Sequence, residues 1–358
     1  MSPAASCPLQ PISSSPRSIL VFRALQVGDM LCAVPALRAL RARFPAARIL
    51  LAGLPWAAGF AGRFDRYIDE FIRFPGHPAL PEQAPDAEGF TAFLHSLSQR
   101  NIDLALQMHG DGSSSNAILA HFGARRLAGF IRSAASPTTD GCFLPYPAQG
   151  HEIERLLSLA AFVGAKSRDT TLEFPLTHED HQELSLQTFA TELKSKRYVC
   201  LHVGARHRNK CWPAACFSAM GDQLSRECGL RVVLTGSAAE YALAADVAAR
   251  MHEPAINAAC DMSLGALAAL IASARLLICN DTAVSHIAAA LRLPSVVIFV
   301  NSDSERWAPL DHERHRCVHD PDGQQSAEVL ALVLAHAKNL LMKQAASVRM
   351  PVPAPHPR

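Results

Sequence analysis

Three polar segments of the 358-residue chain have the side chains to bind an anion or move a proton, and each follows a short apolar run. They contain Asp29, the basic stretch 204–210 and the triplet 280–282. Loops and helix N-termini gather at the carboxyl ends of parallel strands, and ligands bind there. We therefore expect these three segments to carry the function.

The triplet Asn280-Asp281-Thr282 precedes a run of small residues that predicts a helix from Thr282 to about Leu291. The free N–H groups and the positive dipole at the start of such a helix suit a diphosphate. Asp281, Thr282 and His286 are the candidate residues. In the alternative interpretation, Asn280 or Asp281 only caps the helix and His286 only packs in the core.

The basic stretch 204–210 opens with a glycine and ends with a lysine. Gly204 would let the backbone approach a ligand closely, and Lys210 could offer a point charge to a phosphate. The alternative is a solvated basic turn, because lysine and arginine are common at protein surfaces. Asp29 also has two interpretations, as a general base with a pKa set by partial burial or as an ordinary helix N-cap.

The elements that position these residues alternate between apolar runs and amphipathic segments, which predicts an α/β chain with parallel sheets. The length predicts about two domains, at roughly 150 residues per domain. We expect domains at 17–180 and 190–340, with loose Pro- and Ser-rich tails at 1–16 and 345–358. The expected strands are 18–22, 48–53, 102–107, 198–203, 231–236, 276–279 and 295–300, and helices are expected from about Met30 onward, over 216–228 and over 282–291.

Composition excludes several classes of protein. With 49% hydrophobic and 18% charged residues and a net charge of +2, the chain is neither largely disordered nor basic enough for a typical nucleic-acid-binding protein. The ten cysteines lie singly without CxxC spacing, which favours a reducing compartment over disulfides or a zinc site. His312, His315 and His319 fall in a polar stretch that we expect to be a solvated loop. No apolar run reaches the roughly 18 residues of a membrane span and the N-terminus lacks a signal-peptide pattern, so a cytoplasmic location is expected.

Taken together, four motifs resemble glycosyltransferase family 9, which includes the ADP-heptose:lipopolysaccharide heptosyltransferases. The resemblance runs from about 18 to 310. It implies a GT-B fold, with two Rossmann-like domains facing across a cleft, the acceptor on the N-terminal side and a nucleotide sugar on the C-terminal side. The motifs are Gly28-Asp29-Met30-Leu31, Lys210-Cys211-Trp212-Pro213, Leu234-Thr235-Gly236 with Glu240, and Asn280-Asp281-Thr282-Ala283 with His286.

The resemblance also implies roles for individual residues. Asp29 would be the catalytic base, Lys210 would contact the donor phosphates, and Asp281, Thr282 and His286 would surround the diphosphate. Glu240 and Met262 would line the nucleoside, with Gly204 beside the donor. His109 and Asp111 could line the acceptor pocket, although a plain glycine turn is the alternative. The chain departs from the family at Ala283, usually a glycine, and at Gly204-Ala205, usually hydroxyl residues.

We therefore expect an inverting glycosyltransferase that needs neither metal nor cofactor and moves a sugar, plausibly heptose from ADP-heptose, to a lipopolysaccharide core or related glycan. Because that acceptor is membrane-bound, peripheral contact with the inner face of the cytoplasmic membrane is expected. Arg38, Arg41, Arg43 and Arg48 could meet anionic lipid or acceptor phosphates, or simply form a solvated helix face. The alternatives are a GT-B sugar-nucleotide epimerase and a non-catalytic nucleotide-sugar-binding protein.

Overall fold

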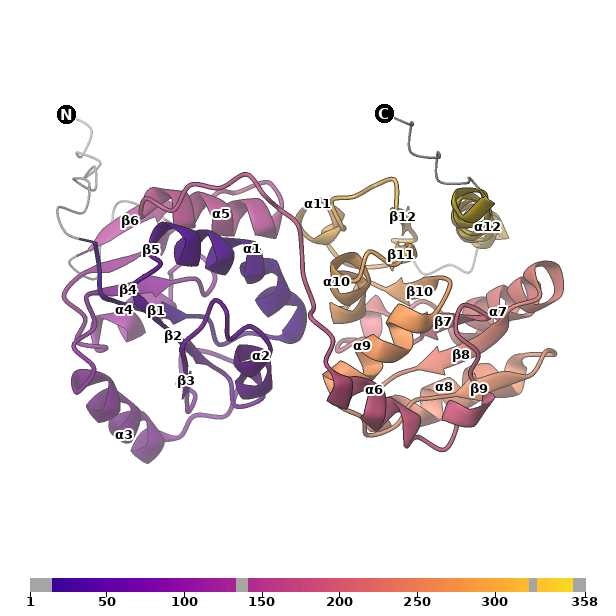
Figure 1. The fold of residues 1–358 in the computed structure, drawn as a ribbon, viewed down its shortest axis with the longest axis horizontal. Helices are drawn as coiled ribbons and strands as arrows, with labels where there is room; N and C mark the ends of the chain where they lie inside the picture. Colours follow the sequence, from indigo (N-terminus) through magenta and orange to yellow (C-terminus); the bar gives the residue numbers. More distant parts are fainter. Residues whose placement is uncertain (1–14, 133–140, 322–326, 350–358) are drawn as a thin grey trace, which may run out of the picture. The chain divides into compact units, whose positions relative to one another are not determined.

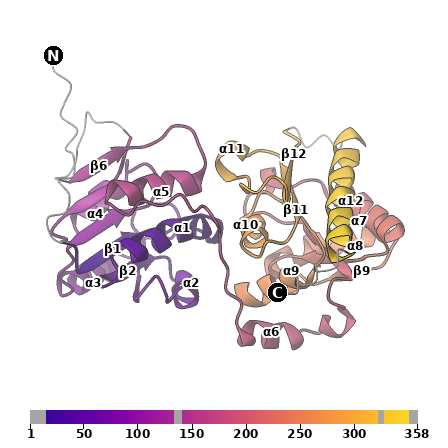
Figure 2. The same cartoon turned by 45° about the horizontal axis from the view of Figure 1, so that its top comes forward.

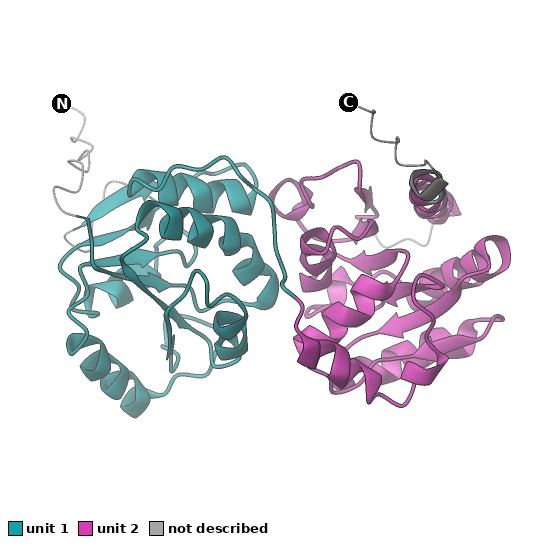
Figure 3. Ribbon diagram, in the orientation of Figure 1, with its two compact units in different colours: residues 1–175 teal, residues 176–358 magenta. Residues whose placement is uncertain are grey.

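The computed structural model describes residues 15–132, 141–321 and 327–349, the last five of these by their backbone only. The chain divides into two compact units, of which the first ends at Pro175 and the second begins at Leu176 (Figure 3). Most of the predicted tails, at 1–14 and 350–358, lies outside the described residues. Residues 345–349 continue the last helix.

The first unit is built on a six-stranded sheet in the order β3-β2-β1-β4-β5-β6, and every described pairing in it is parallel. In β1 the side chains from Ile19 to Phe22 are completely buried, as expected for a strand covered on both faces. The strands are β1 (Ser18–Phe22), β2 (Arg48–Gly53), β3 (Glu70–Arg73), β4 (Leu104–Gln107), β5 (Leu127–Ile131) and β6 (Cys142–Pro145).

Helices cover both faces of this sheet. One face, with Leu20 and Phe22, packs on Phe93 of α3 and Ile118 of α4. Helices α1 and α5 lie side by side (Figures 1 and 2), and α1 leads directly from β1 to β2. The helices are α1 (Val27–Arg43), α2 (Ala57–Arg63), α3 (Ala87–Ser98), α4 (Ser115–Ala120) and α5 (Glu152–Phe162).

The second unit repeats this architecture, with a parallel sheet in the order β12-β11-β10-β7-β8-β9. Read from β9, this is the strand order 3-2-1-4-5-6 of a Rossmann-like unit, as it is in the first unit. The strands are β7 (Tyr198–His202), β8 (Arg231–Thr235), β9 (Ala255–Asn257), β10 (Leu277–Asn280), β11 (Ser295–Phe299) and β12 (His315–His319).

The core of the second unit lies between this sheet and helices α7 and α12, where Leu201 packs with Phe217 and Val333. Helix α6 packs on α9, and α9 contacts α10. The helices are α6 (His178–Ser185), α7 (Ala214–Cys228), α8 (Tyr241–Arg250), α9 (Leu264–Ser273), α10 (Ala283–Ala290), α11 (Ser304–Trp307) and α12 (Ala327–Arg349), with 3-10 turns at Ala190–Glu192, Arg208–Lys210 and Ala238–Glu240.

The predicted α/β class with parallel sheets is confirmed, but the prediction of a solvated loop around His315 is wrong. Residues His315–His319 form β12, the edge strand beside β11. The side chain of His315 is buried, and its Nδ1 lies 2.8 Å from the hydroxyl of Ser295. This stretch forms a strand despite its polar composition, because it pairs with β11 and because His315 has a buried partner in Ser295.

Candidate active site

In each sheet the first three strands are added toward one edge and the last three toward the other, so two neighbouring central strands form a topological switch point. Predicted site residues follow the strands at these points. In the first unit β1 and β4 are neighbours, with Phe22 opposite Gln107. In the second unit β7 and β10 are neighbours, with His202 opposite Cys279. Ligands of doubly wound sheets bind at such switch points, beyond the carboxyl ends of the strands.

In the second unit the switch point brings Lys210 and Asp281 together, although 71 residues separate them in the sequence. The Lys210 ammonium lies 3.3 Å from Oδ2 of Asp281. Asp281 is buried, whereas 29% of the Lys210 side chain remains exposed. The lysine side chain is therefore partly accessible to a ligand, while the carboxylate fixes the position of its ammonium.

The helix after Asp281 is not capped as the simpler interpretation supposed. Its N-cap residue is Thr282, with extended backbone and no capping hydrogen bond from its side chain. The buried Thr282 hydroxyl has no hydrogen-bond partner among the described residues. Buried hydroxyls normally have a partner, so this one marks a polar position open to a ligand group. One turn further, the buried ring of His286 packs edge-on against Trp307, with 6.2 Å between ring centroids.

Gly204 and Glu240 also meet at this switch point. The Glu240 carboxylate accepts hydrogen bonds from the backbone N–H and the hydroxyl of Ser237, at 2.7 and 2.9 Å. Its other oxygen occupies the space that a Cβ at position 204 would need. The absence of a side chain at Gly204 thus leaves room for the Glu240 carboxylate in this position, a reason that the sequence did not reveal.

His202 is the last residue of β7, two positions before Gly204, and its Nδ1 lies 3.1 Å from the hydroxyl of Thr235. Burial lowers the pKa of His202, although the nearby Glu240 acts in the opposite direction. The imidazole is therefore neutral near pH 7. Met262, predicted beside the nucleoside, is half-buried in the turn that precedes α9.

In the first unit Asp29 is the third residue of α1, and Gln26 holds the N-cap position. The interpretation of Asp29 as the N-cap is therefore wrong. Its backbone carbonyl accepts hydrogen bonds from Nε and Nη2 of Arg23, at 3.0 and 2.8 Å. Arg23 is itself buried and also bonds the Met108 carbonyl and the Glu152 carboxylate. The start of α1 is thereby tied to the end of β4 and to α5.

His109 and Asp111 follow β4 and are already engaged by protein groups. The buried His109 ring stacks on Phe22, and its Nδ1 accepts a hydrogen bond from the N–H of Ala24. Asp111 pairs with Arg132 at 2.6 Å. Partial burial acts to raise the pKa of Asp111, but hydrogen bonds from Ser113 and the Arg132 charge hold it below its usual value. Gly110 and Gly112 have positive φ, so this segment is also the glycine turn of the alternative interpretation.

The four arginines in and after α1 also have partners within the first unit. Arg38 pairs with Asp169 at 2.9 Å, and Arg48 pairs with Glu70 at 2.7 Å. The pairs Arg38–Glu173 and Arg41–Asp69 complete this set, while Arg43 lies over the ring of Phe44. Three of the four arginines, Arg38, Arg41 and Arg48, are thus paired with neighbouring carboxylates.

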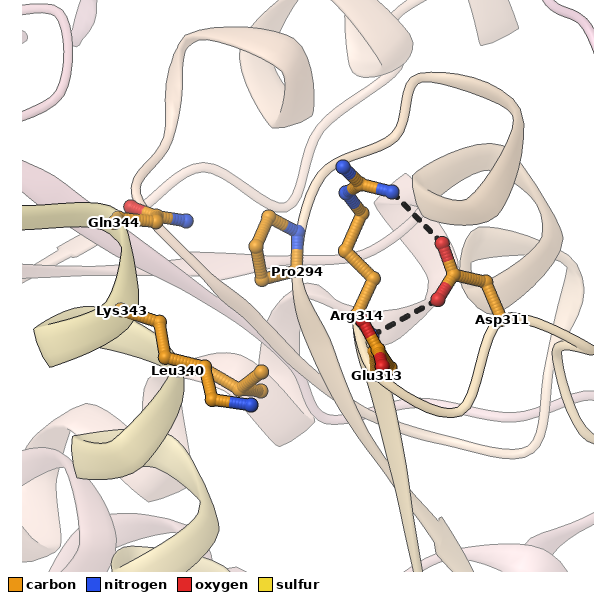
Figure 4. Close-up of a pocket in the computed structure, with 7 residues that line it drawn as sticks. All are labelled: Pro294, Asp311, Glu313, Arg314, Leu340, Lys343 and Gln344. Atoms are coloured by element: carbon orange, nitrogen blue, oxygen red, sulfur yellow. Dashed lines mark hydrogen bonds and ion pairs between the residues drawn. The ribbon is translucent and has the colours of Figure 1, made fainter. Parts of the chain in front are cut away.

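A separate pocket of about 260 Å³ lies beside α12 in the second unit (Figure 4). It is lined by Pro294, Asp311, Glu313, Arg314, Leu340, Lys343 and Gln344, and none of these belongs to the predicted site. Arg314 bonds Asp311 at 2.8 Å.

Among the described residues, no three His, Cys, Asp or Glu side chains are grouped to hold a metal ion. No helix within the described ranges is both long and apolar enough to cross a membrane.

Sequence reasoning missed Arg23, Trp212, Asp320 and the true role of Asn280. Arg23 and Asn280 are polar residues at the carboxyl ends of buried strands, and this unusual position is the signal that could have singled them out. Asn280 is completely buried and bonds both ends of the loop that carries Lys210. Trp212 and Asp320, 108 residues apart, form a buried hydrogen bond that no local pattern indicates.

Comparison with solved structures identifies the two Rossmann-like units as a GT-B fold. A glycosyltransferase family 9 protein from Veillonella parvula aligns over 91% of this chain and 98% of its own, with a TM-score of 0.78 and 18% identity. The ADP-heptose lipopolysaccharide heptosyltransferase II of Escherichia coli aligns over 92% and 99%, with a TM-score of 0.73 and 23% identity. The predicted fold class is thus confirmed.

The model of glycosyltransferase family 9 (heptosyltransferase) matches residues 90–330, and the chain belongs to this family. It is therefore a glycosyltransferase. Its sequence is 28% identical over 308 residues to lipopolysaccharide heptosyltransferase 2 of Salmonella typhimurium, covering 82% of this chain and 86% of that one. It is 32% identical over 165 residues to lipopolysaccharide heptosyltransferase 3 of E. coli, covering 45% and 47%.

Proposed function

We propose that the protein is an inverting, metal-independent glycosyltransferase that moves heptose from ADP-heptose to a lipopolysaccharide core. The observation that carries the proposal is the cluster of Lys210, Asp281 and the orphaned Thr282 hydroxyl at the start of α10. The names of the relatives supply the sugar and the acceptor. A related E. coli heptosyltransferase, 19% identical, was solved with ADP-2-deoxy-2-fluoro heptose.

On the donor side, the cluster suits a nucleoside diphosphate. The ammonium of the partly exposed Lys210 side chain and the N–H groups at the start of α10 offer positive charge to the phosphates. The Thr282 hydroxyl then gains the partner that it lacks. Gly204, Glu240, Met262 and His286 complete the proposed donor site, with Glu240 and Met262 toward the nucleoside.

On the acceptor side, Asp29 is the proposed general base. The acceptor hydroxyl attacks the anomeric carbon, its proton passes to the Asp29 carboxylate, and the bond from that carbon to the diphosphate breaks. Attack opposite the leaving group inverts the anomeric configuration. Lys210 and the helix dipole stabilise the charge that develops on ADP, which is the role a metal ion would otherwise take. His109 and Asp111 are proposed to border the acceptor through the turn that they form.

The protein is also proposed to act at the inner face of the cytoplasmic membrane. The support is the lipid-anchored acceptor rather than the arginines around α1, because Arg38, Arg41 and Arg48 are already paired with carboxylates. Sedimentation with vesicles should therefore require acceptor in the vesicle. Equal binding to vesicles of anionic phospholipid alone would contradict membrane association through the acceptor.

The test of the function is release of ADP from ADP-heptose with and without a heptose-free lipopolysaccharide core. We expect ADP release only when the core is present, with one heptose added to the core by mass spectrometry. Conversion of the donor without acceptor would favour the epimerase. Binding of ADP-heptose with no turnover against a panel of core acceptors would favour the non-catalytic binding protein.

A further inference from the structure

Asn280 uses its whole side-chain amide to join the two ends of one loop. Its Nδ2 donates to the carbonyls of Val203 and Gly204, at 3.0 and 3.1 Å. Its Oδ1 accepts from the N–H of Trp212 at 2.8 Å. The side chain is completely buried at the end of β10, so these bonds are shielded from water.

Trp212 lies at the C-terminal end of this loop, and its indole ring makes further contacts that fix that end. Its indole is 2% exposed, and Nε1 donates to Oδ2 of Asp320 at 2.9 Å. The ring packs edge-on against Phe217, with 5.3 Å between centroids. By contrast, residues 206–209 at the tip are exposed. The loop 203–212 is therefore fixed at its base and open at its tip, the arrangement of an Ω-loop.

Lys210 is two residues from the fixed end, and its partner Asp281 is the residue after Asn280. If the base were open, a loop of this length would let Lys210 occupy many positions. Ligand binding would then have to offset the conformational entropy lost when the loop becomes ordered. Closing the base in the free protein removes this cost from binding.

We propose that Asn280 is a positioning residue that closes the 203–212 loop and so presets Lys210 beside the start of α10 before donor arrives. The effect on donor binding rests on the proposed function, whereas the closed loop does not. The competing interpretation is that Asn280 only satisfies buried backbone groups and supports overall stability.

The test compares Asn280→Asp with Asp222→Ala by hydrogen exchange of the nucleotide-free protein and by calorimetric titration with ADP. Asn280→Asp keeps the size and the acceptor oxygen but loses both donors. Asp222 is the matched control, because its buried carboxylate also accepts backbone bonds, from His252 and Glu253, elsewhere in the second unit.

We expect Asn280→Asp to speed exchange of the Trp212 amide, at the base of the loop, at least tenfold and to weaken ADP binding at least tenfold, while Asp222→Ala leaves both as in the wild type. Unchanged exchange in Asn280→Asp, or equal effects in the control, would overturn the proposal. So would faster exchange across the loop with ADP affinity unchanged.

Wild-type measurements keep the test decisive if Asn280→Asp does not fold. The Trp212 amide should then exchange as slowly as the amides of β7, whereas exchange as fast as at 206–209 would overturn the closed loop. If the wild type itself binds no ADP, the proposed donor is wrong, and the exchange data still decide whether Asn280 closes the loop.

Discussion

The buried guanidinium of Arg23 holds the backbone carbonyl of Asp29 with hydrogen bonds of 3.0 and 2.8 Å. The same guanidinium pairs with the carboxylate of Glu152 at 3.1 Å, and both side chains are almost fully buried. The position of the proposed base therefore depends on an ion pair between two residues that are 129 positions apart along the chain.

Arg23→Met should destabilise the protein by about 3–5 kcal/mol, because it leaves the Glu152 charge buried without this partner. Adding Glu152→Gln should restore about 1–3 kcal/mol, since the uncompensated charge is then removed. Urea unfolding of the four proteins in this cycle measures both effects. Costs that simply add would show that the pair is not coupled.

Lys210→Ala should weaken ADP binding about 10- to 150-fold, the equivalent of the roughly 1.5–3 kcal/mol of a charge-assisted hydrogen bond. Calorimetric titration measures the affinity. Arg208→Ala is the matched control, because it removes the same charge from the exposed tip of the same loop. An equal loss in both variants would mean that the loop attracts ADP only by its net charge, and unchanged affinity in Lys210→Ala would remove that lysine from the site.

His315 should make stability depend on pH between about 6.5 and 4. Burial lowers its pKa to about 4, although Asp311 acts in the opposite direction. The unfolded chain then binds a proton that the folded chain does not, so stability is full above pH 6.5 and falls as the pH drops, by at most about 1.4 kcal/mol per pH unit.

Urea unfolding at pH 7 and pH 5 should show this loss in the wild type and a smaller loss in His315→Gln. The exposed His252 supplies the control, since His252→Gln should keep the wild-type dependence. Identical pH dependence in His315→Gln and the wild type would contradict the assignment.

The parts of the fold that the sequence predicted are those with a strong local signal. Residues 19–22 and 49–52 are continuous apolar runs, and the structure has strands there. Strand β12 was missed because its sequence, HRCVH, is polar, and its burial comes from β11 and Ser295 rather than from its own composition. Short edge strands of this kind are specified by tertiary contacts.

Site residues that belong to a sequence motif could be predicted from the sequence. Those whose role depends only on side-chain contacts in the folded protein could not. Lys210 and Asp281 were marked both by their place after apolar runs and by the family pattern, and the structure joins them. From the sequence, Asn280 could equally cap a helix or close a loop, because its side-chain amide can do either. Only its hydrogen-bond partners in the fold distinguish the two roles. For Asp29, a helix start three residues earlier changes an N-cap into the third residue of the helix. Helix boundaries predicted from sequence commonly miss by about two to four residues.

The most direct test of the account is the turnover of Asp29→Asn with saturating ADP-heptose and lipopolysaccharide core. Asparagine cannot take the acceptor proton, so kcat should fall on the order of 10²–10⁴-fold with ADP affinity unchanged. As an acid in the first turn of α1, Asp29 adds only about 0.3–1 kcal/mol to stability, so the variant should stay folded. A folded Asp29→Asn protein with wild-type turnover would contradict the proposed mechanism.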